Sequence, residues 1–248
     1  IRFRHCARFP DFASVSSESQ RVQIHLQKGL TGKFDTIAVA GGAPITLPTA
    51  IQLADLNGDG KLDIIVLVAD TGFAAADGGS AISGALTMLF QGADPRKPTD
   101  WYQIPSAASS PPANLSLPGG DGKETGPTAL LVGPLDNYYG VDIAVVCNGD
   151  DSQVLLFSNP GGDFAKVASM WAGTSIELDI TEFAGAGLSD LDNDGDLDIA
   201  LSVPAAKSFN LRWLENPLIS LNGAGGIPTY VPDPMGALFE PTARAQAV

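Results

Sequence analysis

Two short stretches of this chain crowd acidic residues immediately before an apolar run. Residues 53–67 read LADLNGDGKLDIIVL, and residues 188–202 read LSDLDNDGDLDIALS. Carboxylates this close together repel one another unless something in the folded chain compensates their charge. The two phrases match position by position, so they are interpreted as copies of one repeated unit.

The oxygen-bearing residues of each phrase follow the spacing of a calcium-binding loop. Positions 1, 3, 5 and 9 carry Asp or Asn, position 6 is a glycine that allows a sharp turn, and the backbone carbonyl of position 7 adds an oxygen. A solvated acidic turn is the alternative, because Asp, Asn and Gly are ordinary turn residues, but two matching copies favour Ca²⁺. The candidate ligands are Asp55, Asn57, Asp59, Lys61 and Asp63 in the first loop, and Asp190, Asp192, Asp194, Asp196 and Asp198 in the second.

The residues that follow each loop argue against an EF-hand. An EF-hand loop has a bidentate Glu at position 12, where this chain has Val66 and Leu201. The runs DIIVLV and DIALSV are typical of strands, so each loop is expected to join two strands. The phrase D-x-[DN]-x-D-G-x-x-D-[IL] before a strand resembles the FG-GAP/VCBS repeat family, which forms the blades of integrin-like β-propellers. That resemblance implies an all-β, calcium-binding propeller.

Composition agrees with an all-β chain. Among 248 residues there are 28 Gly and 18 Pro, and the apolar runs are short and separated by turn residues. No apolar run approaches 18 residues, so no membrane span is expected. The formal net charge of −14 provides no basic surface for nucleic acid.

A wider repeat divides the chain. The phrases PTAIQLAD, PTALLVGP and FAGAGLSD begin at Pro48, Pro127 and Phe183, and PTARAQAV at 241–248 restates the first of them. Propellers often close when a C-terminal strand completes the N-terminal blade, so either a closed four-bladed ring or a segment of a larger propeller fits these phases. We expect one domain over residues 1–248, with blades at 241–248 plus 1–47, 48–126, 127–182 and 183–240.

A third loop position, PLDNYYGVDIAVV at residues 134–146, is degenerate. It keeps Asp136 and Asp142 but has Pro134 and Tyr138 where the first and fifth ligands belong. The third loop is therefore expected to bind Ca²⁺ weakly or not at all.

Other chemistry has little support in the sequence. The two histidines are His5 and His25, and there is no GxSxG, HExxH or phosphate-binding glycine motif. Cys6 and Cys147 show no zinc-site spacing, and the sequence leaves open whether they are free thiols or one disulfide. We expect a chain without enzymatic activity.

The resemblance to integrin-like propellers implies recognition of a protein partner, in adhesion or surface assembly, outside the cytoplasm. A carbohydrate-binding propeller is the alternative, followed by the propeller of a polysaccharide-cleaving enzyme. Lectin sites usually repeat exposed aromatics at one phase of each blade, whereas Trp101, Trp171 and Trp213 do not share one phase and are interpreted as packing residues. Calcium loops of extracellular modules have a Kd of about 0.1–1 mM, which favours a secreted, periplasmic or cell-surface location.

Overall fold

The structure is a computed structural model, and its described residues form an all-β fold of four antiparallel sheets. None of the helices in this part of the chain has the length and apolarity that a membrane crossing requires. The described residues are 11–39, 45, 47–69, 84–104, 124–136, 140–149, 152–166, 171–178, 183–193, 195–205, 208–216 and 231–232.

Each sheet is a meander whose strands pair in chain order. The first sheet contains β1 (Phe12–Ser16), β2 (Arg21–Gln27) and β3 (Phe34–Ala38). The second contains β4 (Pro48–Ala54), β5 (Asp63–Ala69), β6 (Gly84–Gln91) and β7 (Trp101–Ile104). The third contains β8 (Glu124–Gly133), β9 (Asp142–Gly149), β10 (Gln153–Ser158) and β11 (Ala172–Glu177). The fourth contains β12 (Gly185–Ser189), β13 (Asp198–Ala205), β14 (Ser208–Glu215) and β15 (Val231–Pro232), and the short 3-10 helices are η1 (Gly29–Thr31), η2 (Pro98–Asp100) and η3 (Gly162–Lys166).

Burial patterns explain why these segments form strands in a stack of sheets. In β2, Val22, Ile24 and Leu26 are buried and alternate with polar residues, as expected for a strand with one covered face. In β5, every residue from Ile64 to Val68 is buried, because both faces of the second sheet are covered. The continuous apolar run after the first loop therefore marks a strand that lies between two neighbouring sheets.

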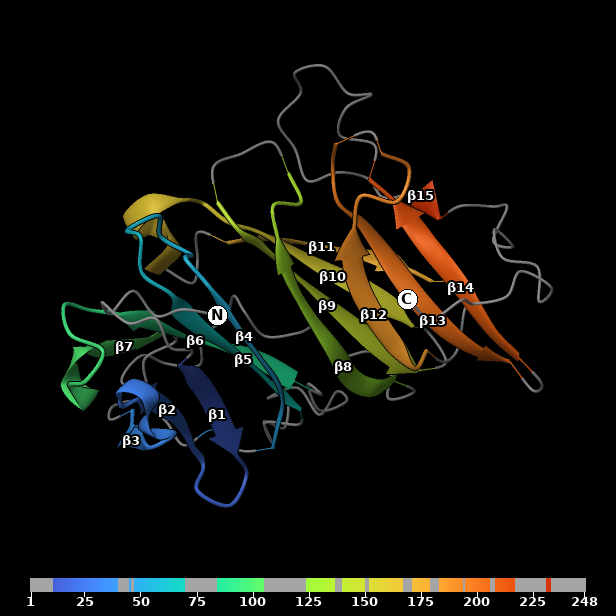
Figure 1. The fold of residues 1–248 in the computed structure, drawn as a ribbon. Helices are drawn as coiled ribbons and strands as arrows, with labels where there is room; N and C mark the ends of the chain where they lie inside the picture. The colour runs from blue at the N-terminus through green and yellow to red at the C-terminus, as the bar shows by residue number, and fades with distance from the viewer. Residues whose placement is uncertain are drawn as a thin grey trace, which may run out of the picture.

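Three apolar cores separate the four sheets, and each core joins consecutive sheets. The core between the first and second sheets contains Ile24 and Ile64, the core between the second and third contains Phe90 and Phe157, and the core between the third and fourth contains side chains of β9 and β13. The first strands of the later sheets lie side by side, with β4 next to β8 and β8 next to β12. Figure 1 shows the sheets following one another in this order, from β1–β3 to β12–β15.

The first sheet differs from the others because it has three described strands. Phe12 of β1 lies opposite His25 of β2, in the same way as Ile64 of β5 lies opposite Leu89 of β6 in the second sheet. The first described strand of this sheet therefore corresponds to the second strand of the other sheets. Within the described residues, β1 pairs with β2 alone, and no closed ring is shown. The expected closing segment, 241–248, lies outside the described residues.

Two tryptophans interpreted as packing residues occupy the cores between sheets. Trp101 packs between the first two sheets and donates through Nε1 to Pro95 O at 3.3 Å. Trp171 packs between the second and third sheets and donates in the same way to Ala165 O at 2.9 Å. Both are buried, so neither offers the exposed ring that a sugar site needs. Cys147 is buried in β9, and Cys6 lies outside the described residues.

Candidate metal centre

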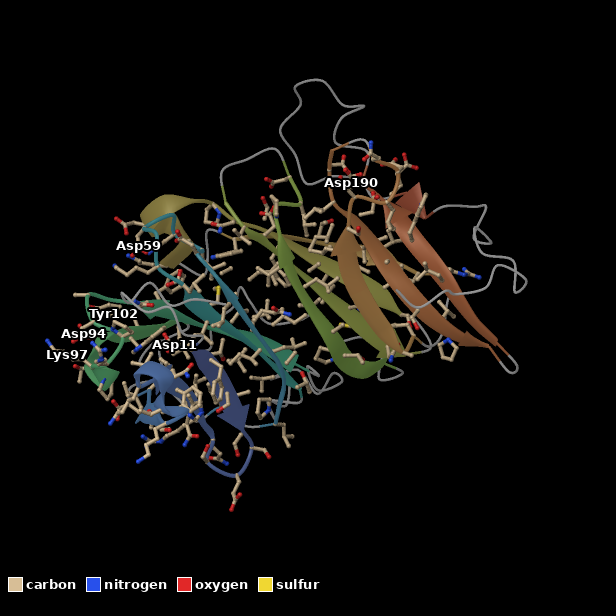
Figure 2. All side chains as sticks on the ribbon, in the orientation of Figure 1. Asp11, Asp59, Asp94, Lys97, Tyr102 and Asp190 are labelled. Carbon is tan, nitrogen blue, oxygen red and sulfur yellow. The ribbon has the colours of Figure 1, made fainter. Side chains whose placement is uncertain are left out.

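The three loops identified in the sequence occupy the same place in successive sheets. The first lies between β4 and β5, the third between β8 and β9, and the second between β12 and β13. In each case the aspartate at position 9 is the first residue of the sheet's second strand: Asp63, Asp142 or Asp198. Figure 2 shows Asp59 and Asp190 on the first and second loops, which are separate regions of the molecule.

The second loop brings three of its predicted ligands together. Carboxylate oxygens of Asp190, Asp192 and Asp198 all lie within 4.8 Å of one another. The amide of Gly195 donates to Asp190 Oδ2 at 3.2 Å, and this glycine has a φ of 102°, which a residue with a side chain adopts only under strain. Asp196, at position 7, is half-buried, and Asp194 lies outside the described residues.

The first loop is held by hydrogen bonds from its own backbone. Asp55 accepts from the amide of Asp59 at 3.0 Å through Oδ1 and from the amide of Gly60 at 2.7 Å through Oδ2. Asn57 is buried, and its Oδ1 accepts from the Asp59 amide at 3.1 Å. Gly60 has a φ of 82°, so the turn depends on a glycine at position 6, as the sequence predicts.

Asp59 of the first loop faces a lysine. Its Oδ1 accepts from the Lys61 amide and its Oδ2 from Lys61 Nζ, both at 2.9 Å. Partial burial acts to raise the pKa of Asp59, but the hydrogen bonds and charge of Lys61 outweigh it and lower the pKa below its usual value. Among the described residues, three acids converge in the second loop, whereas the first loop has Asn57, an amide, at the corresponding position 3.

Asp63 is fully buried and holds two parts of the second sheet together. Its Oδ2 accepts from the amide of Leu56 at 3.0 Å, and its Oδ1 accepts from the amide of Gln91, at the end of β6, at 2.9 Å. Burial raises the pKa of Asp63 to about 7, against the effect of these two hydrogen bonds, and the charges of Asp59 and Asp55 raise it further. This aspartate therefore ties the loop to the third strand of its own sheet.

The bond from this aspartate to the end of the following strand recurs in all four sheets, and the bond to a loop amide recurs in the third and fourth sheets. Asp142 accepts from the amides of Leu135 at 2.7 Å, Asp136 at 3.0 Å and Asn159 at 2.9 Å. In the fourth sheet, Asp198 accepts from the amides of Leu191 and Asn216, both at 2.9 Å. In the first sheet, Asp11 accepts from the amide of Gln27 at 2.8 Å, and it too is buried.

A family model described as an FG-GAP-like repeat matches residues 8–66, which contain Asp11, the whole first sheet and the first loop. The resemblance to an FG-GAP-like repeat is therefore confirmed over residues 8–66. No curated protein matches the chain at a significant level.

Sequence reasoning missed Asp11 as a member of the FG-GAP-like pattern, and it read Asp63 and Asp198 only as metal ligands. The signal for Asp11 is present, because PDFASV at 10–15 repeats the acid-then-strand order of LDIIVL at 62–67. It was obscured because no acidic loop precedes it. The structural role of the position-9 aspartate could not be read from spacing, because its partner amide lies on another strand.

Two asparagines join neighbouring sheets, and neither was predicted. Asn159 Nδ2 donates to Val141 O at 3.0 Å in its own sheet and to Leu56 O, in the first loop, at 2.8 Å. Asn216 Nδ2 likewise donates to Leu197 O at 3.2 Å and to Leu135 O, in the third loop, at 3.1 Å. The sequence signal is the shared Asn-Pro that ends QVLLFSNP and NLRWLENP.

In the third loop, the acid at the place of the position-3 ligand takes part in a hydrogen bond within its own sheet. The hydroxyl of Ser158 donates to Asp136 Oδ2, which occupies the position-3 ligand place. Pro134 stands at position 1 and has no side-chain oxygen, while Tyr138 lies outside the described residues. These features agree with the prediction of weak or no Ca²⁺ binding here, which remains a prediction.

The donor set of the second loop fits a calcium ion. It consists of hard carboxylate oxygens, it carries three negative charges, and the oxygens already lie close enough to share one cation. Asp190, Asp192 and Asp198 would hold the ion, which would supply the positive charge that offsets their mutual repulsion. The first loop has the same ligand types, but Asp59 is engaged by Lys61.

Asp142 predicts a pH dependence of stability that is independent of metal. Burial raises its pKa from 3.8 to about 6, partly opposed by the hydrogen bonds from Asn159 and Leu135. A carboxyl whose pKa is higher in the folded chain stabilises the fold most when protonated, and this contribution of about 3 kcal/mol is lost as the pH rises from 4 through 6. Urea unfolding should therefore show that the free energy of unfolding of the wild type falls by about 3 kcal/mol between pH 4 and 7, relative to that of Asp142→Asn. If the free energies of unfolding of the wild type and Asp142→Asn changed equally with pH, the raised pKa of Asp142 would be contradicted.

Proposed function

We propose that this chain is a non-enzymatic, calcium-binding β-propeller module, in which bound ions hold the loops between strands and recognition takes place elsewhere on the surface. The observation that carries this proposal is the convergence of Asp190, Asp192 and Asp198 within 4.8 Å, on a loop that has a near-copy in the first loop. The recurrent aspartate connection supports a structural role for the bound ions, because the candidate ligands at position 9 also accept hydrogen bonds from the end of the third strand of their sheets.

Calcium titration tests the metal part of this proposal. Isothermal titration with CaCl₂ should show two sites with Kd values of about 0.1–1 mM. Asp190→Ala should remove one of them, because it deletes a carboxylate of the converging group. The matched control is Glu18→Ala, which deletes an exposed acid in the turn between β1 and β2 and should leave both sites intact. A wild type that takes up no calcium would refute the proposal.

We propose a protein partner and a location outside the cytoplasm, on a cell surface, in the periplasm or secreted. Sites with a Kd near 0.1–1 mM stay largely empty at cytosolic calcium levels, so a chain that depends on them belongs in a calcium-rich compartment. Adhesion or surface assembly is the corresponding activity. Fractionation of the source cells that places the native protein in the cytoplasm would oppose this location.

Carbohydrate binding is the second candidate, and one described surface favours it. On the first sheet, Phe12 is exposed, stacks on His25 with ring centroids 4.3 Å apart and meets Phe34 edge-on at 5.1 Å. Exposed rings beside hydroxyl groups suit the faces of sugars, and Ser14 and Thr36 both contact the His25 ring. Glycan-array binding that is lost in Phe12→Ala would select this candidate. Pull-down of a protein partner that survives the same substitution would select the first. A polysaccharide-cleaving enzyme is the remaining alternative, and turnover of a glycan would be its signature.

The domain organisation is proposed as one propeller over residues 1–248, in which 241–248 completes the first sheet. The available edge is that of β1, which pairs with β2 alone among the described strands. Deleting 241–248 should then leave an unpaired edge, and the protein should aggregate or melt several degrees earlier. Unchanged melting, followed by differential scanning calorimetry, would favour the alternative of a segment from a larger propeller.

A further inference from the structure

The two candidate calcium loops differ at position 7, where the first has Lys61 and the second Asp196. Position 7 contributes a backbone carbonyl to a calcium loop, so its side chain is free to alter the charge of the site. In the first loop that side chain is a cation, and its Nζ lies 2.9 Å from Asp59 Oδ2. In the second loop position 7 adds a further negative charge.

A second lysine lies within electrostatic reach of the first loop. Lys166, on η3 of the third sheet, donates to Asp163 Oδ1 at 2.9 Å. This hydrogen bond is the main cause of the raised pKa of Lys166, and the charges of Asp59 and Asp63 contribute to the same shift. The acids of the first loop therefore act on lysines from two sheets.

We propose that Lys61 is a built-in counter-cation of the first loop, so that calcium fills the second loop first and the first loop only at higher concentration. This inference rests on the proposed calcium-binding function and assigns an order to its two sites. The ammonium group neutralises part of the loop's charge before any metal arrives. Calcium must then displace it from Asp59 or bind beside it, and either route weakens the affinity.

The positions of the carboxylate oxygens also support this order. Asp190, Asp192 and Asp198 already lie within 4.8 Å of one another, whereas both oxygens of Asp59 are directed at Lys61. The second loop therefore needs little rearrangement to take an ion, and preorganised ligands bind more tightly. A divalent ion and an ammonium group a few ångströms apart repel enough to change Kd by about tenfold even in water.

The test reads each loop separately by isothermal titration with CaCl₂. Asp192→Ala disables the second loop and leaves the first to be titrated, and Asp55→Ala does the reverse. The second loop should bind about tenfold more tightly than the first. Adding Lys61→Met to the Asp192→Ala background should tighten the first loop by about tenfold, because the methionine keeps the backbone carbonyl and removes the charge.

Two controls and a second readout separate the charge effect from general damage. Lys28→Met removes a lysine that pairs with Asp35 at 2.5 Å on the first sheet, and it should leave the titration unchanged. In EDTA, Lys61→Met should melt earlier than the wild type, since the carboxylates lose their cation, yet it should gain more stability from calcium. If Lys61→Met does not fold, Lys61→Gln takes its place in both measurements.

The outcomes distinguish this inference from the proposed function. Equal affinities in the two loops, or an unchanged or weaker first site in Lys61→Met, would overturn the role of Lys61 while leaving calcium binding in place. The absence of calcium uptake by either loop would overturn both.

Discussion

Replacing Asp142 by Ala is expected to destabilise the fold by about 3 kcal/mol, equally in calcium and in EDTA. The carboxylate accepts from three backbone amides, of Leu135, Asp136 and Asn159, and is 4% exposed. Each buried donor left without a partner costs about 1–3 kcal/mol, and the loss is offset in part because a buried charge is also removed. For a chain of this size the melting temperature should fall by roughly 6–12 °C.

Circular dichroism melts at pH 7 measure this effect. The control is Asp163→Ala, which removes an exposed acid and should change stability by less than about 0.5 kcal/mol. A variant Asp142→Ala that melts with the wild type would mean that the connection between the third loop and β10 contributes little. A variant that is destabilised only in calcium would mean that the third loop holds an ion, against the expectation from its sequence.

Removing calcium is the second change with a large expected effect. A site with a Kd near 0.1 mM in 1–2 mM calcium stabilises the folded state by about 1.5–2 kcal/mol, and the two loops together contribute about 2–4 kcal/mol. That is a substantial share of a net stability of about 5–15 kcal/mol. EDTA should therefore lower the melting temperature of the wild type by roughly 4–16 °C.

Ligand substitutions show whether this stabilisation arises from the loops. Asp190→Ala and Asp59→Ala should each reduce the gain from calcium, and Asp190→Ala should leave the melting temperature in EDTA almost unchanged, because its side chain is exposed. Binding of the partner by the folded variants should be little affected. Variants that melt normally in calcium but lose the partner would place the ion in the recognition site and contradict the structural role.

The parts of the fold predictable from sequence are those set by neighbouring residues. The acidic spacing and glycine of each loop predict a turn, and the β-branched run after it predicts a strand, because both signals lie within about 15 residues. The contacts between sheets were not predictable in this way. Asn159 reaches Leu56 O across 103 positions, and the amide partner of Asp63 is Gln91, so neither partner is visible in a local pattern.

The candidate site, too, was predictable only where neighbouring residues in the sequence decide it. The sequence predicts the candidate ligands and their positions, but it treats the two loops as equivalent. The difference between them depends on where the Lys61 side chain lies relative to Asp59, which is decided by side-chain packing in the folded loop. The role of Asp11 was missed because the pattern around it lacks the preceding acidic turn that identified the other loops.

A crystal structure of the full chain grown in millimolar calcium would show whether the second loop holds an ion. We expect a cation in the second loop bound by oxygens of Asp190, Asp192 and Asp198 at about 2.3–2.6 Å, with the first loop occupied when calcium is raised. Anomalous scattering would confirm the identity of the ion as calcium. A second loop without an ion under these conditions, with its carboxylates turned outward into solvent, would contradict the proposed calcium site.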